Sequence, residues 1–243
     1  MANSYETKPA GAQQAAQVAA EQQAEAPPVR RRRTWLFQIL LVASLGLFAV
    51  LAVLARGAAY FPLDLTISQL LQGLRSPAFQ ALMQALSWLG YLPQAVAVLL
   101  LPAALAWWLG YRWEAVMIVA SSLAVVFVNS LVKLVVARPR PPDTLVEVYT
   151  TLSTNSFPSG HVMFAVGLFG FLLFLAFAIL RRSVLRALLV TLFALLIGLM
   201  GISRVYLGEH WASDVLGAYL LGMPALAAAV SIYHWGLERF FKK

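Results

Sequence analysis

Three short sequence blocks hold the residues whose chemistry could act on a phosphate group. They run over 133–141, 158–161 and 203–214. Phosphoryl transfer needs cations around the equatorial oxygens, an in-line nucleophile and an acid for the leaving oxygen. The blocks contain residues of all three kinds, so we interpret them as parts of one candidate active site.

The predicted phosphate-binding residues are three cations and a helix start. Lys133, Arg140 and Arg204 supply the cations, because an arginine fork holds two oxygens at once and a lysine acts as a point charge. Ser159 and Gly160 precede a long apolar stretch, where unpaired N–H groups of a helix N-terminus attract anions. We expect Ser159 to donate its hydroxyl and Gly160 to permit close approach.

Two histidines and one carboxylate are the predicted catalytic residues. His210 and Asp214 are four residues apart and share one face if a helix begins by His210. The carboxylate then holds one ring nitrogen and leaves the other free to attack phosphorus. His161 comes from a different block and protonates the leaving oxygen. We therefore predict His210 as nucleophile, Asp214 as its orienting residue and His161 as general acid.

Each of these residues has a simpler explanation when it is considered alone. A histidine at a span end is more often a polar residue at headgroup depth, and an Arg-Pro loop is more often a stiff connector. His234 lies between two aromatic residues and fits such a role, and Asn129 fits an interhelical hydrogen bond. The joint occurrence of the three blocks is what favours a site.

Membrane-spanning helices are the elements that must position the blocks. The 243 residues are 61% hydrophobic and 12% charged, which is typical of a chain whose solvent is lipid. The amphipathic segment 57–93, with a helix start at Ser76-Pro77, predicts short interfacial helices between the first and second spans. We predict an all-α polytopic membrane protein with six transmembrane helices, at 35–55, 95–109, 116–136, 161–180, 185–202 and 215–233.

The ends of the spans indicate the domain organisation and the orientation. Residues 1–33 are predicted to be a disordered cytoplasmic tail with a basic end, and 34–243 the six-span domain. Two spans separate the second and third blocks, so both lie on one face of the membrane. Basic residues there oppose the positive-inside bias and indicate an anionic partner. We expect a multi-pass plasma (inner) membrane protein with its site on the non-cytoplasmic face; its oligomeric state stays open.

Composition also excludes several classes of function. The chain has no cysteine, which excludes thiolate nucleophiles, thiolate zinc sites and iron–sulfur clusters. Its net charge is +8, but the basic residues lie between apolar runs rather than on a solvated face, so we expect membrane lipids and no nucleic acid as partners. The outer carboxylates form no close cluster of the kind used by two-metal phosphatases. We expect no metal and no cofactor.

The three blocks together resemble the signature of the type 2 phosphatidic acid phosphatase family. That signature is Lys, six residues, Arg-Pro; then Pro-Ser-Gly-His; then Ser-Arg, five residues, His, three residues, Asp, and the chain matches it throughout. The resemblance extends from about Trp35 onward. It implies a metal-independent mechanism through a phosphohistidine at His210 that water hydrolyses, and it favours Arg140 over Arg138 as phosphate ligand.

The expected function is hydrolysis of a lipid phosphomonoester or diphosphate. Polyprenyl diphosphate, phosphatidate and phosphatidylglycerophosphate all present a phosphate at headgroup depth, and the sequence does not choose among them. One alternative is a lipid-to-lipid phosphotransferase that uses the same site. A second is a non-enzymatic anion-binding or transport protein, which is disfavoured because the spans lack ionisable residues deep inside to line a conduction path.

Overall fold

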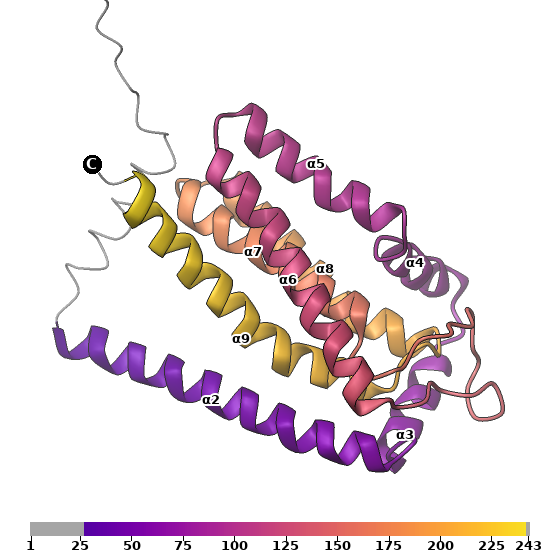
Figure 1. The fold of residues 1–243 in the computed structure, drawn as a ribbon. Helices are drawn as coiled ribbons and strands as arrows, with labels where there is room; N and C mark the ends of the chain where they lie inside the picture. Colours follow the sequence, from indigo (N-terminus) through magenta and orange to yellow (C-terminus); the bar gives the residue numbers. More distant parts are fainter. Residues whose placement is uncertain (1–26, 242–243) are drawn as a thin grey trace, which may run out of the picture.

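The computed structural model of the chain describes residues 27–241, and within this range every regular element is helical. The absence of strands from the described residues confirms the predicted all-α class. The helices, labelled as in Figure 1, are α2 (Pro27–Gly57), α3 (Pro62–Gln72), α4 (Pro77–Trp88), α5 (Gln94–Trp108), α6 (Arg112–Val136), α7 (Gly160–Ile179), α8 (Val184–Tyr206), α9 (Ala212–Gly236) and the π-helical η1 (Leu237–Phe241).

Within the described residues, five helical segments are long and apolar enough to cross a membrane. The helix α5, predicted as the second span, is 15 residues long and reaches about 22 Å, short of a hydrocarbon core of about 30 Å. The sixth crossing therefore stays a prediction. The five segments are Thr34–Gly57, Arg112–Val136, Gly160–Ile179, Val184–Tyr206 and Ala212–Phe240.

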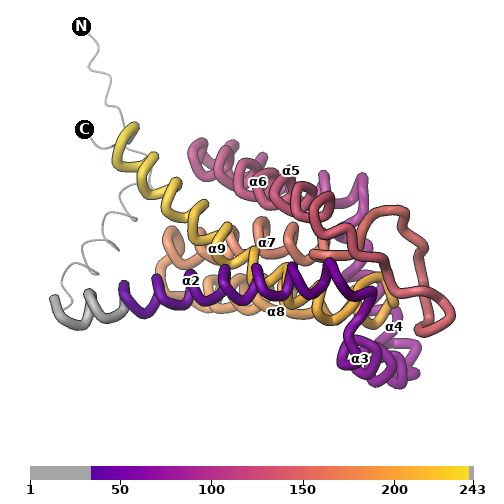
Figure 2. The backbone as a smooth tube through the Cα atoms, turned by 60° about the horizontal axis from the view of Figure 1, so that its bottom comes forward, coloured from indigo at the N-terminus to yellow at the C-terminus, as the bar shows by residue number. Residues whose placement is uncertain are grey.

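The helix α7 forms the centre of the bundle. It packs against α6, α8 and α9, and the tube in Figure 2 shows it enclosed by them while α2 lies along the outside. In the most apolar stretch of α7, 72% of the residues are buried. In the corresponding stretch of α2, only 6% are buried. A helix that is apolar all round belongs in such a core, and α7 contains no charged residue.

The amphipathic segment forms α3 and α4, which lie at one end of the bundle in Figure 1. The Ser76 hydroxyl accepts the Phe79 N–H and a proline opens α4, as predicted. In α3 the polar face is turned inward: Asp64 is buried, whereas Leu63 and Leu70 are 67% and 72% exposed. This inverted pattern suits a helix whose outer surroundings are lipid. Its place at the membrane interface stays a prediction.

The first long helix begins earlier than the sequence indicated. Residues 27–33, expected at the end of a disordered tail, continue α2 toward its N-terminus. The rest of the predicted tail, residues 1–26, lies outside the described residues. The division of the chain at residue 34 therefore stays a prediction.

The connection between α6 and α7 is anchored to the bundle by Phe157. This side chain is fully buried and stacks on Phe48 of α2 at a centroid distance of 5.8 Å. A Cβ atom at Gly217 of α9 would lie 2.5 Å from two carbons of its ring. Only a glycine at this position lets the loop, and the residues that follow Phe157, pack directly on α9.

We therefore predict opposite effects for two Gly→Ala substitutions inside helices. Gly217→Ala should lower the free energy of unfolding by about 1–3 kcal/mol, because the new methyl group overlaps a buried ring. Gly198→Ala in α8 is the matched control: it meets nothing within 4 Å and should stabilise the helix by up to roughly 1 kcal/mol. Thermal unfolding in detergent micelles measures both, and equal shifts would contradict the packing described.

Candidate active site

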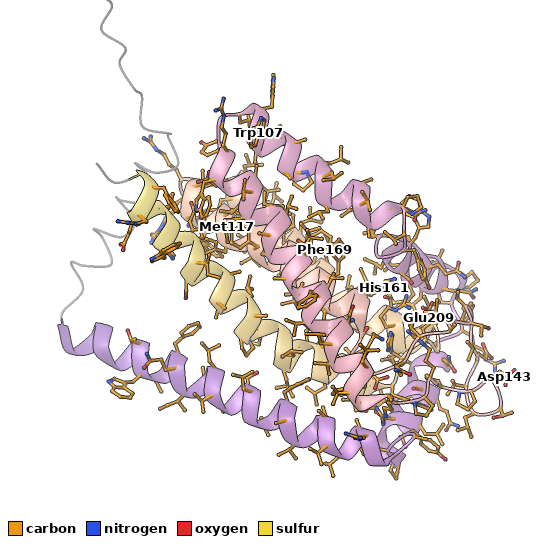
Figure 3. All side chains as sticks on the ribbon, viewed as in Figure 1. Trp107, Met117, Asp143, His161, Phe169 and Glu209 are labelled. Atoms are coloured by element: carbon orange, nitrogen blue, oxygen red, sulfur yellow. The ribbon has the colours of Figure 1, made fainter. Side chains whose placement is uncertain are left out.

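The three sequence blocks meet at one end of the bundle. The Ser159 N–H donates to the Asp214 carbonyl oxygen (3.2 Å), which joins the start of α7 to the start of α9. Arg140 in the α6–α7 loop lies 3.2 Å from His210, measured from Nη1 to Nε2. In Figure 3 His161 and Glu209 lie together at this end, whereas Trp107 and Met117 lie toward the other.

His210 lies in the connection between α8 and α9 and is 1% exposed. Its Nδ1 is 3.4 Å from the Ser156 hydroxyl and 3.5 Å from Asp214 Oδ2. Its Nε2 is directed to the Arg140 guanidinium. The two ring nitrogens thus have different surroundings, with the carboxylate on one side and a predicted phosphate ligand on the other.

The contact between His210 and Asp214 does not arise from a shared helix face. The helix α9 begins at Ala212, after His210, so the expected helical geometry is wrong. Instead, Asp214 Oδ2 accepts the Trp211 N–H (2.9 Å) and the Ser156 hydroxyl, and the turn before the helix brings the imidazole near. A separation of 3.5 Å exceeds a normal hydrogen bond, which is common for catalytic pairs before substrate binds.

The surroundings of His210 favour its neutral form. Burial lowers the pKa of His210 well below its ordinary value of 6.5, and the charges of Arg140, Lys133 and Arg204 lower it further. A neutral imidazole retains the lone pair that a nucleophile requires. The electrostatics therefore suit His210 to attack phosphorus rather than to bind phosphate as a cation.

The cations Lys133 and Arg140 are both oriented by the loop at residues 154–156. Arg140 donates to the Thr154 carbonyl oxygen (2.7 Å) and hydroxyl (2.9 Å), and to the Glu209 carbonyl oxygen (2.6 Å). Lys133 Nζ donates to the carbonyl oxygens of Asn155 and Ser156. These partners are carbonyl and hydroxyl oxygens, so within the described residues neither side chain is paired with a carboxylate, and both are available to an anion.

Arg204 is fully buried and is held differently from the other two cations. It forms an ion pair with Glu209, and its Nη1 donates to the Ser87 hydroxyl. Its guanidinium lies 5.4 Å from the centre of the Tyr91 ring, and the Tyr91 hydroxyl donates to Glu209 Oε1 (2.6 Å). The sequence did not single out either partner. Tyr91 lies in the α4–α5 connection outside every block, and Glu209 lies inside the third block without a predicted role.

The start of α7 presents Ser159, Gly160 and His161 to the same region. Ser159 is the N-cap; its N–H is bonded to the α9 backbone rather than free as expected, but its buried hydroxyl is unpaired. The His161 ring packs edge-on against Tyr91 at 4.7 Å, and a Cβ at Gly90 would overlap it. Ser159 Oγ, His161 Nε2 and Arg204 Nε are among the buried polar atoms of the described residues that have no hydrogen-bond partner, which makes them candidate ligands for substrate.

Arg138, whose role the sequence left open, is directed away from the phosphate cations. Its side chain is buried and donates to Asp214 Oδ1 (2.7 Å) and Asp64 Oδ2 (2.9 Å). Its Nε donates to the Ala58 carbonyl oxygen at 3.2 Å. Arg138 is thus the buried partner of two carboxylates, and Arg140 remains the predicted phosphate ligand of the pair.

Comparison with known proteins gives a family for this arrangement. The model described as the PAP2 superfamily matches residues 114–238, slightly more than half of the chain. The chain belongs to the PAP2 superfamily. This confirms the family that the three blocks resemble, and the match includes all of them.

Relatives of this PAP2 chain are found in Bacillus subtilis. It is 28% identical over 197 residues to phosphatidylglycerophosphatase B of strain 168, which covers 81% of this chain and 95% of the relative. A crystal structure described as the first transmembrane PAP2 type phosphatidylglycerolphosphate phosphatase from B. subtilis matches with a TM-score of 0.69 at 24% identity. It covers 82% of this chain and 98% of the other, so the fold is shared. The chain is a multi-pass membrane protein of a phosphatase family.

No cluster of ligands suited to a metal ion occurs in residues 27–241 of this PAP2 protein. Specifically, no group of three or more His, Cys, Asp or Glu residues is placed to hold one there. Asp214 and Asp64 are each engaged with Arg138, and Glu209 is paired with Arg204. Metal independence remains a prediction, and the phosphate assay proposed below tests it.

The electrostatics of His210 give a spectroscopic prediction. The chain has three histidines, so ¹⁵N-histidine labelling with His161→Gln and His234→Gln variants assigns each imidazole. We expect His210 to retain the ¹⁵N shifts of a neutral ring as the pH is lowered through 6.5 to about 5.5, because burial and three cations oppose protonation. Protonation at or above pH 6.5 would show that the ring is not held neutral.

Proposed function

We propose that this PAP2 protein removes phosphate from a lipid phosphomonoester or diphosphate through a phosphohistidine at His210. One observation supports this most: a buried imidazole whose Nε2 lies 3.2 Å from the guanidinium of Arg140 while its Nδ1 is turned toward Asp214. A phosphate bound by Arg140 would therefore lie next to a nucleophilic nitrogen.

In the first step, the lone pair of His210 Nε2 forms a bond to phosphorus. The bond between phosphorus and the lipid oxygen breaks, and its electron pair leaves with that oxygen. His161, whose Nε2 is buried and unpaired, gives the oxygen a proton; the negative charge of the bound phosphate favours its imidazolium form. Lys133, Arg140 and Arg204 balance the charge on the equatorial oxygens.

In the second step, water hydrolyses the phosphohistidine. The water oxygen bonds to phosphorus, the phosphorus–nitrogen bond breaks, and its electron pair returns to His210 Nε2. The water proton passes to His161, which is then ready to act again as an acid. Asp214 holds the proton on Nδ1 throughout, because a carboxylate on that side stabilises the positive charge that the attacking ring acquires.

The substrate is proposed to be a lipid of the polyprenyl diphosphate, phosphatidate or phosphatidylglycerophosphate type. The name of the B. subtilis relative and the description of the B. subtilis crystal structure both specify phosphatidylglycerophosphate as the substrate of those proteins. The position of the site at one end of a bundle of apolar helices supports a substrate whose phosphate lies at the membrane surface. We further propose six crossings of the plasma (inner) membrane, a cytoplasmic tail and a site open to the non-cytoplasmic side.

The nucleophile is tested by phosphate release from a panel of lipid phosphates in the presence of EDTA. His210→Gln should reduce kcat by about four orders of magnitude or more, since nothing else in the site can replace the attacking nitrogen. His234→Gln is the matched control, because His234 lies near the far end of α9, and it should keep wild-type activity. Turnover in His210→Gln well above that level would end the assignment, and loss of activity in EDTA would overturn metal independence.

The covalent intermediate is tested separately with a ³²P-labelled substrate. Rapid quenching of the wild-type protein should trap an acid-labile, base-stable label on His210, as a nitrogen–phosphorus bond requires, and His210→Gln should carry none. Product analysis with a second lipid present distinguishes acceptors. Label recovered only as inorganic phosphate supports hydrolysis, whereas label on the second lipid would make the protein a phosphotransferase. Lipid turnover without any trapped label would favour direct attack by water.

A further inference from the structure

We propose that Asp64 on α3 is a positioning residue of the active site, which acts on His210 through Arg138 and Asp214. The inference rests on the proposed role of His210 as nucleophile. Asp64 lies outside the three sequence blocks, on the inward face of α3, and is buried there with Ser68. Its effect reaches the imidazole through direct contacts between buried side chains.

The path from Asp64 to the imidazole has three contacts. Asp64 Oδ2 accepts from Arg138 Nη2 at 2.9 Å, and Arg138 Nη1 donates to Asp214 Oδ1 at 2.7 Å. The other oxygen of Asp214 lies 3.5 Å from His210 Nδ1. All four side chains are at most 3% exposed, so water does not screen the path.

A second set of contacts fixes the first turn of α9 to Asp64. The Ser213 N–H donates to Asp64 Oδ1 (2.8 Å), and its hydroxyl donates to Oδ2 (2.7 Å). Arg138 Nη1 also contacts this hydroxyl (2.7 Å). Asp64 is itself fixed at the start of α3, where Oδ2 accepts the Phe61 N–H. Because Ser213 precedes Asp214, Asp64 sets the position of the residue that faces His210.

The charges of this cluster supply the functional argument. The Arg138 guanidinium contacts both carboxyl groups. When both are ionised, Asp64, Arg138 and Asp214 together carry one net negative charge on the Nδ1 side of His210. The cations elsewhere around the ring are Lys133, Arg140 and Arg204, and Arg204 is paired with Glu209. His161 is the neighbouring titratable group. The net negative charge opposes these cations when the attacking imidazole becomes positive. Without Asp64, Arg138 would neutralise Asp214 and remove this stabilisation.

The substitution Asp64→Asn tests this role, because it keeps the side-chain shape and removes the charge. We expect kcat to fall roughly tenfold with KM unchanged, in the range known for outer partners that orient histidines at metal sites. The ¹⁵N resonances of His210 should also shift. Glu114→Gln is the matched control: Glu114 is also buried, and it accepts from the Tyr233 hydroxyl (2.9 Å) at the opposite end of α6. It should leave both kcat and the His210 resonances as in the wild type.

The outcomes separate the inference from the proposed function. An active wild type whose kcat and His210 resonances survive Asp64→Asn would overturn the role of Asp64, even if the unfolding temperature falls. A wild type without phosphatase activity would overturn the proposed function, and the His210 resonances would then decide the inference alone. If Asp64→Asn does not fold, Arg138→Lys replaces it: lysine keeps the charge but cannot bridge two carboxylates, and the same loss of kcat is expected.

Discussion

The ionic cluster of Asp64, Arg138 and Asp214 is the constraint on which the geometry of the site depends. Charges removed from water require partners, and a buried ion left alone destabilises a protein by roughly 3–5 kcal/mol. The cluster joins α3, the α6–α7 loop and α9. These elements cannot separate without exposing an unpaired charge to an apolar interior. A polar network of this kind gives these three elements one relative position.

Around that cluster, the proposed site combines an imidazole whose surroundings favour its neutral form with cations that other parts of the chain hold in place. Carbonyl oxygens of the loop at residues 154–156 hold Lys133 and Arg140, and a carboxylate holds Arg204. Groups that are already in place need no reorganisation when charge develops on phosphorus. Because the same cations disfavour a protonated His210, they also keep the proposed nucleophile in its reactive form.

Local signals in the sequence were enough to find the helices and the candidate chemistry. Apolar runs located the long helices to within a few residues, apart from the start of α2, because hydropathy is visible without neighbours. The Ser76-Pro77 start of α4 was recognisable for the same reason: a cap bonds to its own first turn. The spacings from Lys133 to Arg140 and from His210 to Asp214 indicated both the site and the superfamily.

The sequence by itself thus determined which residue types are available and where along the chain the long apolar helices run. Only the tertiary structure decided how they are paired. Arg138 and Asp64 are 74 residues apart, and no periodicity or capping rule connects them. Tyr91 reaches Glu209 from a different connection, and His210 meets Asp214 through a turn rather than along a helix. Such contacts depend on how helices pack in three dimensions, which a local pattern does not contain.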